Sequence, residues 1–236
     1  MISAGILKSC GALLHSEDWE VRRYSALLTG GLISVMQGRV LMIESEVFPG
    51  LQEKLTDDVL EVREAVAWTL CRLTNSRDGV QIMVESNTIP SMVGAFIQYA
   101  DPHDVVSEWA QYLLYLLESF INLTEYDNGI EPVLGTGLMN SLANLIKNSK
   151  KLAPHRKEIV ERTLHVIANI SMNPAGKQEG VDEEVINVAS PFIKPSKTYE
   201  QRRLGCSVIM SVTILLAGKK QTVADKGIVK HLFKLL

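Results

Sequence analysis

Histidine and cysteine side chains are the first candidates for metal or nucleophile chemistry, and their spacing supports neither. A helical zinc site needs two histidines four residues apart or a nearby ligand set, and neither occurs among His15, His103, His155, His165 and His231. Cys10, Cys71 and Cys206 are odd in number and far apart, which argues against disulfides. We predict that all three are buried free thiols in a reducing, cytoplasmic setting.

Motifs for catalysis or phosphate binding do not stand out either. Gly135 and Gly137 form an isolated pair without a preceding strand or a following Lys-Ser/Thr, so they predict a junction between helical units and not a phosphate loop. The sequence has no nucleophile elbow, Cys–His pair or paired-carboxylate arrangement. We therefore predict a protein that is not an enzyme and that has no cofactor and no metal site.

The charge distribution offers binding chemistry instead. Residues 1–128 carry a formal charge of −10 and residues 129–236 carry +7, within a net charge of −3. Acidic residues gather in three early predicted turns, at Glu17, Asp18, Asp57, Asp58, Asp101 and Asp104. Basic residues, named here the basic edge, gather around two later turns: Lys147, Lys150, Lys151, Arg156, Lys157, Lys194, Lys197, Arg202 and Arg203.

Two interpretations of the basic edge stay open. It could attract an acidic protein surface, or it could serve only to keep the loops soluble. Nucleic acid is a weaker choice of partner, because the chain is net acidic, Tyr199 is the main aromatic residue among these charges, and no nucleic-acid motif is present.

These turns belong to a repeat that runs through the whole chain. Aligned apolar openings at Ile6, Phe48, Ile89, Leu138, Ile186 and Ile228 are separated by 42, 41, 49, 48 and 42 residues, and armadillo and HEAT units fall near this length. Each unit reads as an opening helix, a polar turn, a longer helix and a short amphipathic helix. Pro49 and Pro90 fall in predicted first helical turns, and glycines such as Gly79 are expected to end the long helices as left-handed C-caps.

The repeat predicts an all-α, armadillo/HEAT-type right-handed α-solenoid of about five repeats plus a partial sixth. It forms a single domain over residues 1–236, with units at about 5–46, 47–87, 88–136, 137–184, 185–226 and a partial 227–236. No apolar run of 18 residues or secretory signal is present, so no membrane association is expected. Because the last unit stops after one helix, we expect either a piece of a longer protein or an end that another chain covers.

Several segments resemble the armadillo-repeat consensus: TIPSMV, EVREAVAWTLCRLTN, NGIEPVLGTGLMNSL, VIANISMNPAGKQ and LAGKKQTVADKGIVKHL. The resemblance covers essentially the whole chain. Armadillo grooves bind extended peptides through an asparagine ladder on the long helices, and the matching positions are Gly31, Arg72, Asn122, Asn169 and Ser211. Only two of these five are Asn. Trp68 precedes Arg72 by one turn, whereas Glu118 and His165 precede the two asparagines, so Trp and Asn never occur together as they do in nuclear-import adaptors.

The resemblance thus implies a groove that holds a partner other than a nuclear-import signal. Its predicted residues are Trp68, Arg72, Asn122, His165, Asn169 and Ser211. Trp68 is either such an anchor or a packed aromatic side chain.

Within the family, VFPGLQEKLTDDVLEVREAVAWTLCRLTNSRDGVQIMV and VTILLAGKKQTVADKGIVKHLFKLL are similar to repeats of the armadillo proteins of axonemal radial spokes. That similarity implies a structural scaffold in the cytoskeleton of the ciliary axoneme, with radial spoke components as partners. The alternative is a soluble cargo or signalling adaptor that binds peptide segments in the groove.

Overall fold

The computed structural model describes residues 4–45, 47–100 and 107–234. Over these residues the chain forms helices and no β-strand, which confirms the predicted all-α class. The helices group into two compact units. Unit 1 comprises Met1–Tyr99 and Glu108–Val133, and unit 2 comprises Ala100–Ser107 and Leu134–Leu236.

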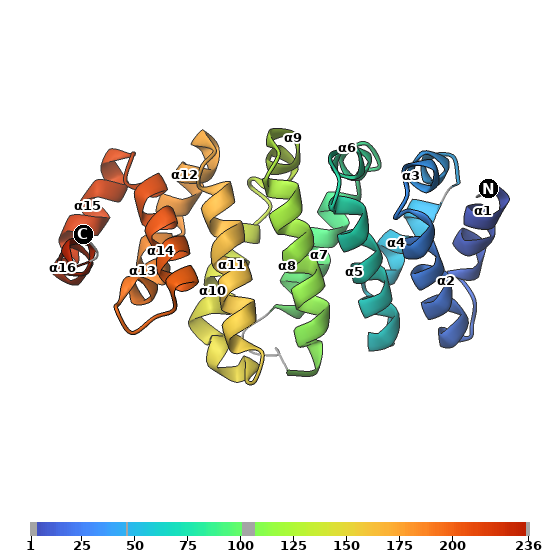
Figure 1. Ribbon diagram of the computed structural model, residues 1–236, viewed down its shortest axis with the longest axis horizontal. Helices are drawn as coiled ribbons and strands as arrows, with labels where there is room; N and C mark the ends of the chain where they lie inside the picture. The colour runs from blue at the N-terminus through green and yellow to red at the C-terminus, as the bar shows by residue number, and fades with distance from the viewer. Residues whose placement is uncertain (1–3, 46, 101–106, 235–236) are drawn as a thin grey trace. The chain divides into compact units, whose positions relative to one another are not determined.

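Unit 1 repeats a set of three helices, in which the middle helix is the longest (Figure 1). Its elements are α1 (Ala4–Leu13), α2 (Trp19–Leu32), α3 (Met36–Ile43), α4 (Val47–Lys54), α5 (Leu60–Thr74), α6 (Arg77–Glu85), α7 (Thr88–Tyr99), α8 (Ala110–Thr124), α9 (Asp127–Ile130) and the 3-10 turn η2 (Glu131–Val133). A further 3-10 turn, η1 (Ser107–Trp109), precedes α8. The long helices α2, α5 and α8 lie side by side, and α3, α6 and α9 lie at one end of them (Figure 1).

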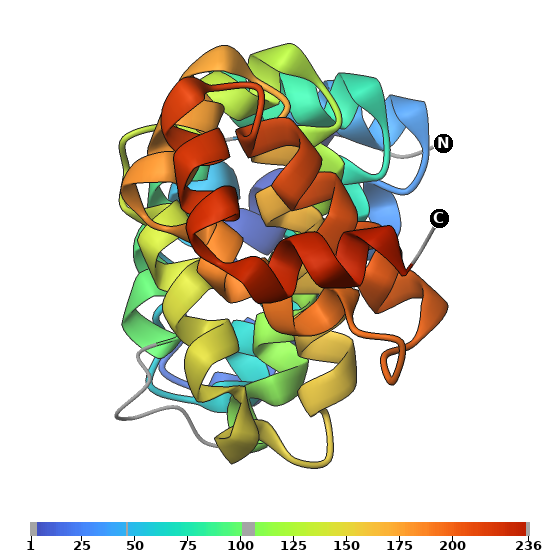
Figure 2. The same cartoon turned by 90° about the vertical axis from the view of Figure 1, so that its left-hand side faces the viewer.

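Unit 2 repeats the same order of first, long and short helices. Its elements are α10 (Leu138–Asn148), η3 (Ser149–Leu152), α11 (Arg156–Ile170), α12 (Pro174–Asp182), α13 (Val185–Ala189), η4 (Ser190–Ile193), α14 (Tyr199–Val212), α15 (Leu216–Ala224) and α16 (Lys226–Phe233). The long helices α11 and α14 pack against each other. A sharp bend separates α15 from α16 (Figure 2), where the Asp225 carboxylate caps α16 by accepting from the Gly227 N–H at 2.8 Å.

Local signals explain where these helices begin. Asp18, Ser76, Asn173 and Thr198 each accept a backbone N–H bond at the start of the following helix, which satisfies donors that the helix itself cannot. Pro49 and Pro90 fall in the first turns of α4 and α7, as the sequence predicts.

The predicted glycine C-caps are wrong. Gly79, Gly176 and Gly218 lie inside α6, α12 and α15, and the described glycines with a left-handed backbone are Gly135 and Gly137. At Gly79 an added Cβ would lie 1.8 Å from the Leu73 carbonyl oxygen. An added Cβ would lie 1.9–2.2 Å from the corresponding carbonyl oxygen at four further glycines: Gly38, Gly129, Gly176 and Gly218. Each repeat therefore uses glycine so that its short helix can touch the end of its long helix.

The core of unit 1 is built around α5. Its Val66 and Leu70 are fully buried, and the Thr69 hydroxyl lies 2.8 Å from the Ala26 carbonyl oxygen of α2. The rings of Phe96 in α7 and Phe120 in α8 meet edge to face at 5.5 Å. Such burial of aliphatic and aromatic side chains between neighbouring repeats is the main stabilising interaction of a helical array.

Candidate partner-binding surfaces

A pocket lies on the long helices of unit 1, between α2, α5 and α8. Its volume is about 170 Å³, and its lining residues are Arg23, Leu27, Glu61, Glu64, Ala65, Trp68 and Tyr115. Glu61, Glu64 and Trp68 are spaced at i, i+3 and i+7 along α5, so they form one stripe of that helix. Two carboxylates and two aromatic rings thus surround one small cavity that also contains a single cation, Arg23.

Trp68 is both packed and available. An added Cβ at Gly30 would lie 2.4 Å from the Trp68 ring, so this part of the ring rests on the backbone of α2. The residue is half-buried and also lines the pocket. The contact with α2 agrees with the interpretation of Trp68 as a packed side chain, and its role as an anchor for a partner stays a prediction.

The ladder positions of unit 1 connect neighbouring repeats. The Arg72 guanidinium lies 5.0 Å from the centre of the Trp68 ring, and its Nη2 donates to the Ser34 hydroxyl at 2.6 Å. One repeat later, the Asn122 Nδ2 donates to Oδ1 of Asn75, the residue equivalent to Ser34, at 2.8 Å. The carbonyl oxygen of the Asn122 side chain is the group left to accept a hydrogen bond from a partner.

The surroundings of the pocket disfavour the ionised form of Glu64. Burial raises the pKa of Glu64, and the nearby Glu61 carboxylate raises it further, although Arg23 and Arg63 partly oppose both effects. A second cation near Glu64 would relieve this repulsion. The pocket can therefore accept an ammonium or guanidinium group, whose alkyl stem would lie against the rings of Trp68 and Tyr115.

The other predicted groove residues belong to unit 2. His165 and Asn169 are half-buried on α11, one turn apart. Ser211 on α14 is only 6% exposed, so it is the least available of the three to a partner.

The structure separates the residues of the predicted basic edge into groups. Arg156, Lys157 and Lys197 line one pocket of about 250 Å³, whereas Lys147, Lys150 and Lys194 are exposed elsewhere on unit 2. Arg203 instead forms a 2.6 Å ion pair with Glu200, and Nε of Arg202 is buried without a hydrogen-bond partner. Of Lys151 only the backbone is described.

The predicted acidic turns are not uniform either. Glu17, Asp18 and Asp58 are exposed, but Asp57 is only 5% exposed because it forms an ion pair with Arg22. The sequence analysis grouped Asp57 with the other acidic turn residues, and its burial in an ion pair corrects that grouping. Asp101 and Asp104 lie outside the described residues.

Comparison with known proteins identifies the architecture. A HEAT-repeat family model matches residues 47–76, the segment that contains α4 and α5. A computationally designed armadillo repeat protein for modular peptide recognition aligns with 97% of this chain and 91% of its own length, at 16% identity and a TM-score of 0.77.

The fold is an armadillo/HEAT-type α-solenoid.

Two further structures resemble this solenoid. An engineered protein aligns with 98% of the chain and 90% of its own length at 15% identity, with a TM-score of 0.77. A designed armadillo repeat protein in complex with the peptide (KR)4 aligns with 88% of the chain and 82% of its own length at 16% identity, with a TM-score of 0.71. No curated protein matches the chain.

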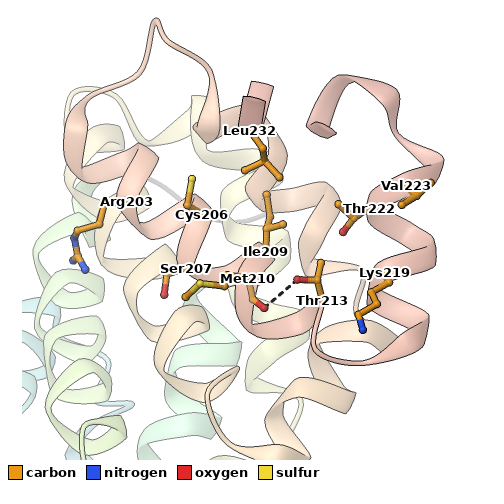
Figure 3. A pocket seen from close by; sticks show the side chains of 10 residues that line it. All are labelled: Arg203, Cys206, Ser207, Ile209, Met210, Thr213, Lys219, Thr222, Val223 and Leu232. Carbon is orange, nitrogen blue, oxygen red and sulfur yellow. Dashed lines mark hydrogen bonds between the residues drawn. The ribbon is translucent and has the colours of Figure 1, made fainter. Parts of the chain in front are cut away.

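The solenoid pattern shows that one face of α14 is uncovered. Cys71 in α5 and Ala168 in α11 hold the same repeat position as Met210 in α14. The first two are 8% and 2% exposed, whereas Met210 is 67% exposed. Met210 lines an apolar groove of about 810 Å³ between α14, α15 and α16, together with Ile209, Val223 and Leu232 (Figure 3).

Cys206 lies in the same groove and corrects the prediction that all three thiols are buried. It is half-exposed, whereas Cys10 and Cys71 are buried. Burial raises the pKa of the Cys206 thiol, and the positive charge of Arg202 opposes this effect.

No group of three or more His, Cys, Asp or Glu side chains in the described part of the chain is arranged to hold a metal ion. None of the described helices is long and apolar enough to cross a membrane.

Glu61, Glu64 and Tyr115 were not among the groove residues predicted from the sequence. A signal for the two glutamates was present, since both lie on the α5 stripe that leads to Trp68 and Arg72. Tyr115 comes from the next repeat, 47 residues after Trp68, and carries no comparable local signal.

Proposed function

We propose that this solenoid is a non-enzymatic protein-binding scaffold, and that the long-helix face of unit 1 holds an extended segment of its partner. A lysine or arginine side chain of that segment would enter the pocket of Glu61, Glu64, Trp68 and Tyr115. The observation that carries the proposal is this pocket, in which two carboxylates and two aromatic rings face one cavity.

The chemistry fits a cation with an apolar stem. Aromatic faces attract an ammonium or guanidinium group, and the two carboxylates outnumber Arg23 among the charged groups of the lining. Because Arg72 already stacks on Trp68, the partner's cation is expected on the side of the pocket near Glu61, Glu64 and Tyr115. The designed armadillo protein bound to (KR)4 is a precedent for a basic segment on this fold.

Binding of the partner's backbone would follow from Asn122. Its side-chain nitrogen is occupied by Thr74 and Asn75, so its oxygen would accept an N–H bond from the segment. That interaction recognises an extended chain without recognising its sequence.

Fluorescence anisotropy with labelled host peptides tests this proposal. The peptides should differ only at one central position, occupied by Lys, Arg, Ala or Glu. We expect the full chain to prefer Lys and Arg, and expect Glu64→Gln or Trp68→Ala to weaken their binding about tenfold, as loss of a partly desolvated charge or ring contact does. Glu20→Gln, which removes an exposed carboxylate of α2 outside the pocket, is the matched control. Equal affinity for the Lys and Ala peptides would reject the proposal.

The same assay on a peptide array distinguishes a structural scaffold from a cargo or signalling adaptor. An adaptor should bind a whole class of short basic peptides with similar affinity. A scaffold should bind most of them weakly and one large partner tightly.

A location in the ciliary axoneme is a separate proposal. Its support is the similarity of residues 47–84 and 212–236 to repeats of radial spoke armadillo proteins. Cross-linking mass spectrometry on isolated axonemes tests it, with cross-links to radial spoke components as the expected result. Absence of the protein from washed axonemes of cells that express it would reject this location and leave the groove proposal intact.

A further inference from the structure

A second pocket, in unit 2, has the opposite charge. It lies where α11 and α14 begin, beside η4, and has a volume of about 250 Å³. Arg156, Lys157 and Lys197 supply three positive charges to its lining, and none of the lining side chains is acidic. Phe192 and Val160 supply apolar surface.

Two of the three cations contact uncharged groups of the protein. Nε of Arg156 donates to the hydroxyl of Ser149 at 3.1 Å, and the Lys197 ammonium lies 5.2 Å from the centre of the Phe192 ring. Within the described part of the chain, neither these two residues nor Lys157 forms an ion pair.

Neighbouring carboxylates are engaged elsewhere. Glu158 pairs with Arg162 at 2.6 Å, and Glu200 pairs with Arg203 at 2.6 Å. Glu161 accepts a hydrogen bond from the Thr198 hydroxyl at 3.1 Å. Two of these carboxylates are thus paired with arginines, and none of the three lines the pocket.

Gln201 adds an uncharged hydrogen-bonding group to the lining. It lines the pocket and is only 8% exposed. Its backbone N–H caps α14 by donating to Thr198, but its side-chain amide forms no hydrogen bond with any described residue. The amide atoms are accessible from the pocket, because neither is among the buried unpaired side-chain atoms of the described residues. The amide nitrogen could therefore donate a hydrogen bond to an oxygen of a bound anion.

The start of α11 adds a further attraction for an anion. His155 occupies the N-cap position, and its side chain makes no capping hydrogen bond. The first N–H groups of this 15-residue helix therefore lack the side-chain acceptor that Thr198 gives to α14. Free N–H groups and the helix dipole both favour negative charge at this end.

We propose that this pocket binds the phosphate group of a phosphorylated protein segment. Three cations and an unpaired amide donor match a dianion with three acceptor oxygens better than they match a single carboxylate. The Phe192 and Val160 surface would contact the residues that flank the phosphate. This site is separate from the unit 1 pocket and does not depend on the function proposed for it.

Anisotropy titration of the full chain tests the proposal with a labelled Gly/Ser-rich peptide that contains one phosphoserine. The same peptide with serine or glutamate at that position shows whether phosphate is needed. We expect the phosphopeptide to bind at least tenfold more tightly than either, and Arg156→Gln and Lys197→Met each to weaken it about tenfold. Lys147→Met and Lys194→Met, which remove exposed charges outside the pocket, should change the affinity less than twofold.

Several outcomes would overturn this site. Equal binding of the glutamate peptide would mean that only general negative charge is recognised. An equal effect of the Lys147 and Lys194 controls would mean a diffuse basic surface. Competition by inorganic phosphate without phosphopeptide binding would mean a small-anion site, and tighter binding of a single-stranded RNA or an anionic lipid vesicle through Arg156 and Lys197 would mean a different class of partner. Circular dichroism melting of each variant confirms that it is folded, and Glu64→Gln in unit 1 should leave phosphopeptide binding unchanged.

Discussion

Arg22 and Asp57 form a buried, bidentate ion pair between consecutive repeats of unit 1. Nε and Nη2 of Arg22 donate to the two carboxylate oxygens of Asp57 at 2.8 and 2.9 Å. Nη1 of the same guanidinium donates to the carbonyls of Ser16 and Glu17, both at 3.0 Å. One side chain thus connects the turn before α2 to the turn before α5.

Removing the carboxylate should destabilise unit 1 strongly. Asp57→Ala leaves the buried Arg22 guanidinium without its counter-charge, and breaking such a pair from one side costs about 3–5 kcal/mol. Asp58→Ala is the matched control, because Asp58 is adjacent and exposed and should change stability by less than about 0.5 kcal/mol. Urea unfolding followed by circular dichroism measures both, and similar midpoints for the two variants would contradict the prediction.

Acid should weaken the same pair. Burial alone would raise the pKa of Asp57, but hydrogen bonds from Arg22 and Val59 and the charges of Arg22 and Lys54 outweigh it and lower the pKa below the usual aspartate value. A lowered pKa in the folded state contributes stability that is present above the unfolded aspartate pKa of about 3.9 and is lost as pH falls through the folded value. Wild-type stability should therefore fall more steeply below about pH 4 than that of Asp57→Asn. Parallel pH–stability curves would show that the pair contributes nothing through this linkage.

Two glycine substitutions should act in opposite directions. Gly79→Ala places a Cβ 1.8 Å from the Leu73 carbonyl oxygen, and the resulting strain should cost about 1–3 kcal/mol. Gly94 in α7 has no atom within 4 Å of its would-be Cβ, so Gly94→Ala should stabilise the protein by about 0.5–1 kcal/mol through helix propensity. Thermal melting distinguishes the two, and a stabilising Gly79→Ala would refute the close contact.

Affinity for a lysine peptide should depend on pH through Glu64. Because burial and Glu61 raise the pKa of Glu64, its carboxylate should be protonated at a higher pH than an ordinary glutamate. Binding should therefore weaken as pH falls toward that raised value, while the peptide lysine stays charged. In Glu64→Gln the pH dependence over this range should be smaller, and an unchanged profile in that variant would assign the effect to another group.

Alkylation should distinguish Cys206 from the other two thiols. In the folded protein, Cys206 should react with iodoacetamide before Cys10 and Cys71, because it is half-exposed and they are buried. Its raised pKa should still make it slower than a free cysteine, since the thiolate is the reactive form. Arg202→Met should slow the reaction further by removing the charge that opposes the shift. Mass spectrometry of timed digests measures all three rates, and faster labelling of Cys71 would contradict the burial order.

Local pattern was enough to predict the all-α class and the recurring order of first, long and short helices. Apolar spacing, capping residues and prolines act within a few residues of one another, and they are visible in the chain without its fold. The Glu61–Glu64–Trp68 stripe on α5 was likewise within reach, because i, i+3 and i+7 positions share a helix face in any context.

Packing between repeats determined the rest. Asp57 looked like one more acidic turn residue until the fold placed Arg22, 35 positions earlier, against it. Gly79 looked like a C-cap, and only its approach to the Leu73 carbonyl explains why it has no side chain. Tyr115 and Gln201 line their pockets together with residues that come from other helices. Such contacts depend on how neighbouring helices are offset and rotated, and no local rule specifies that geometry, because many side-chain arrangements share the same apolar period.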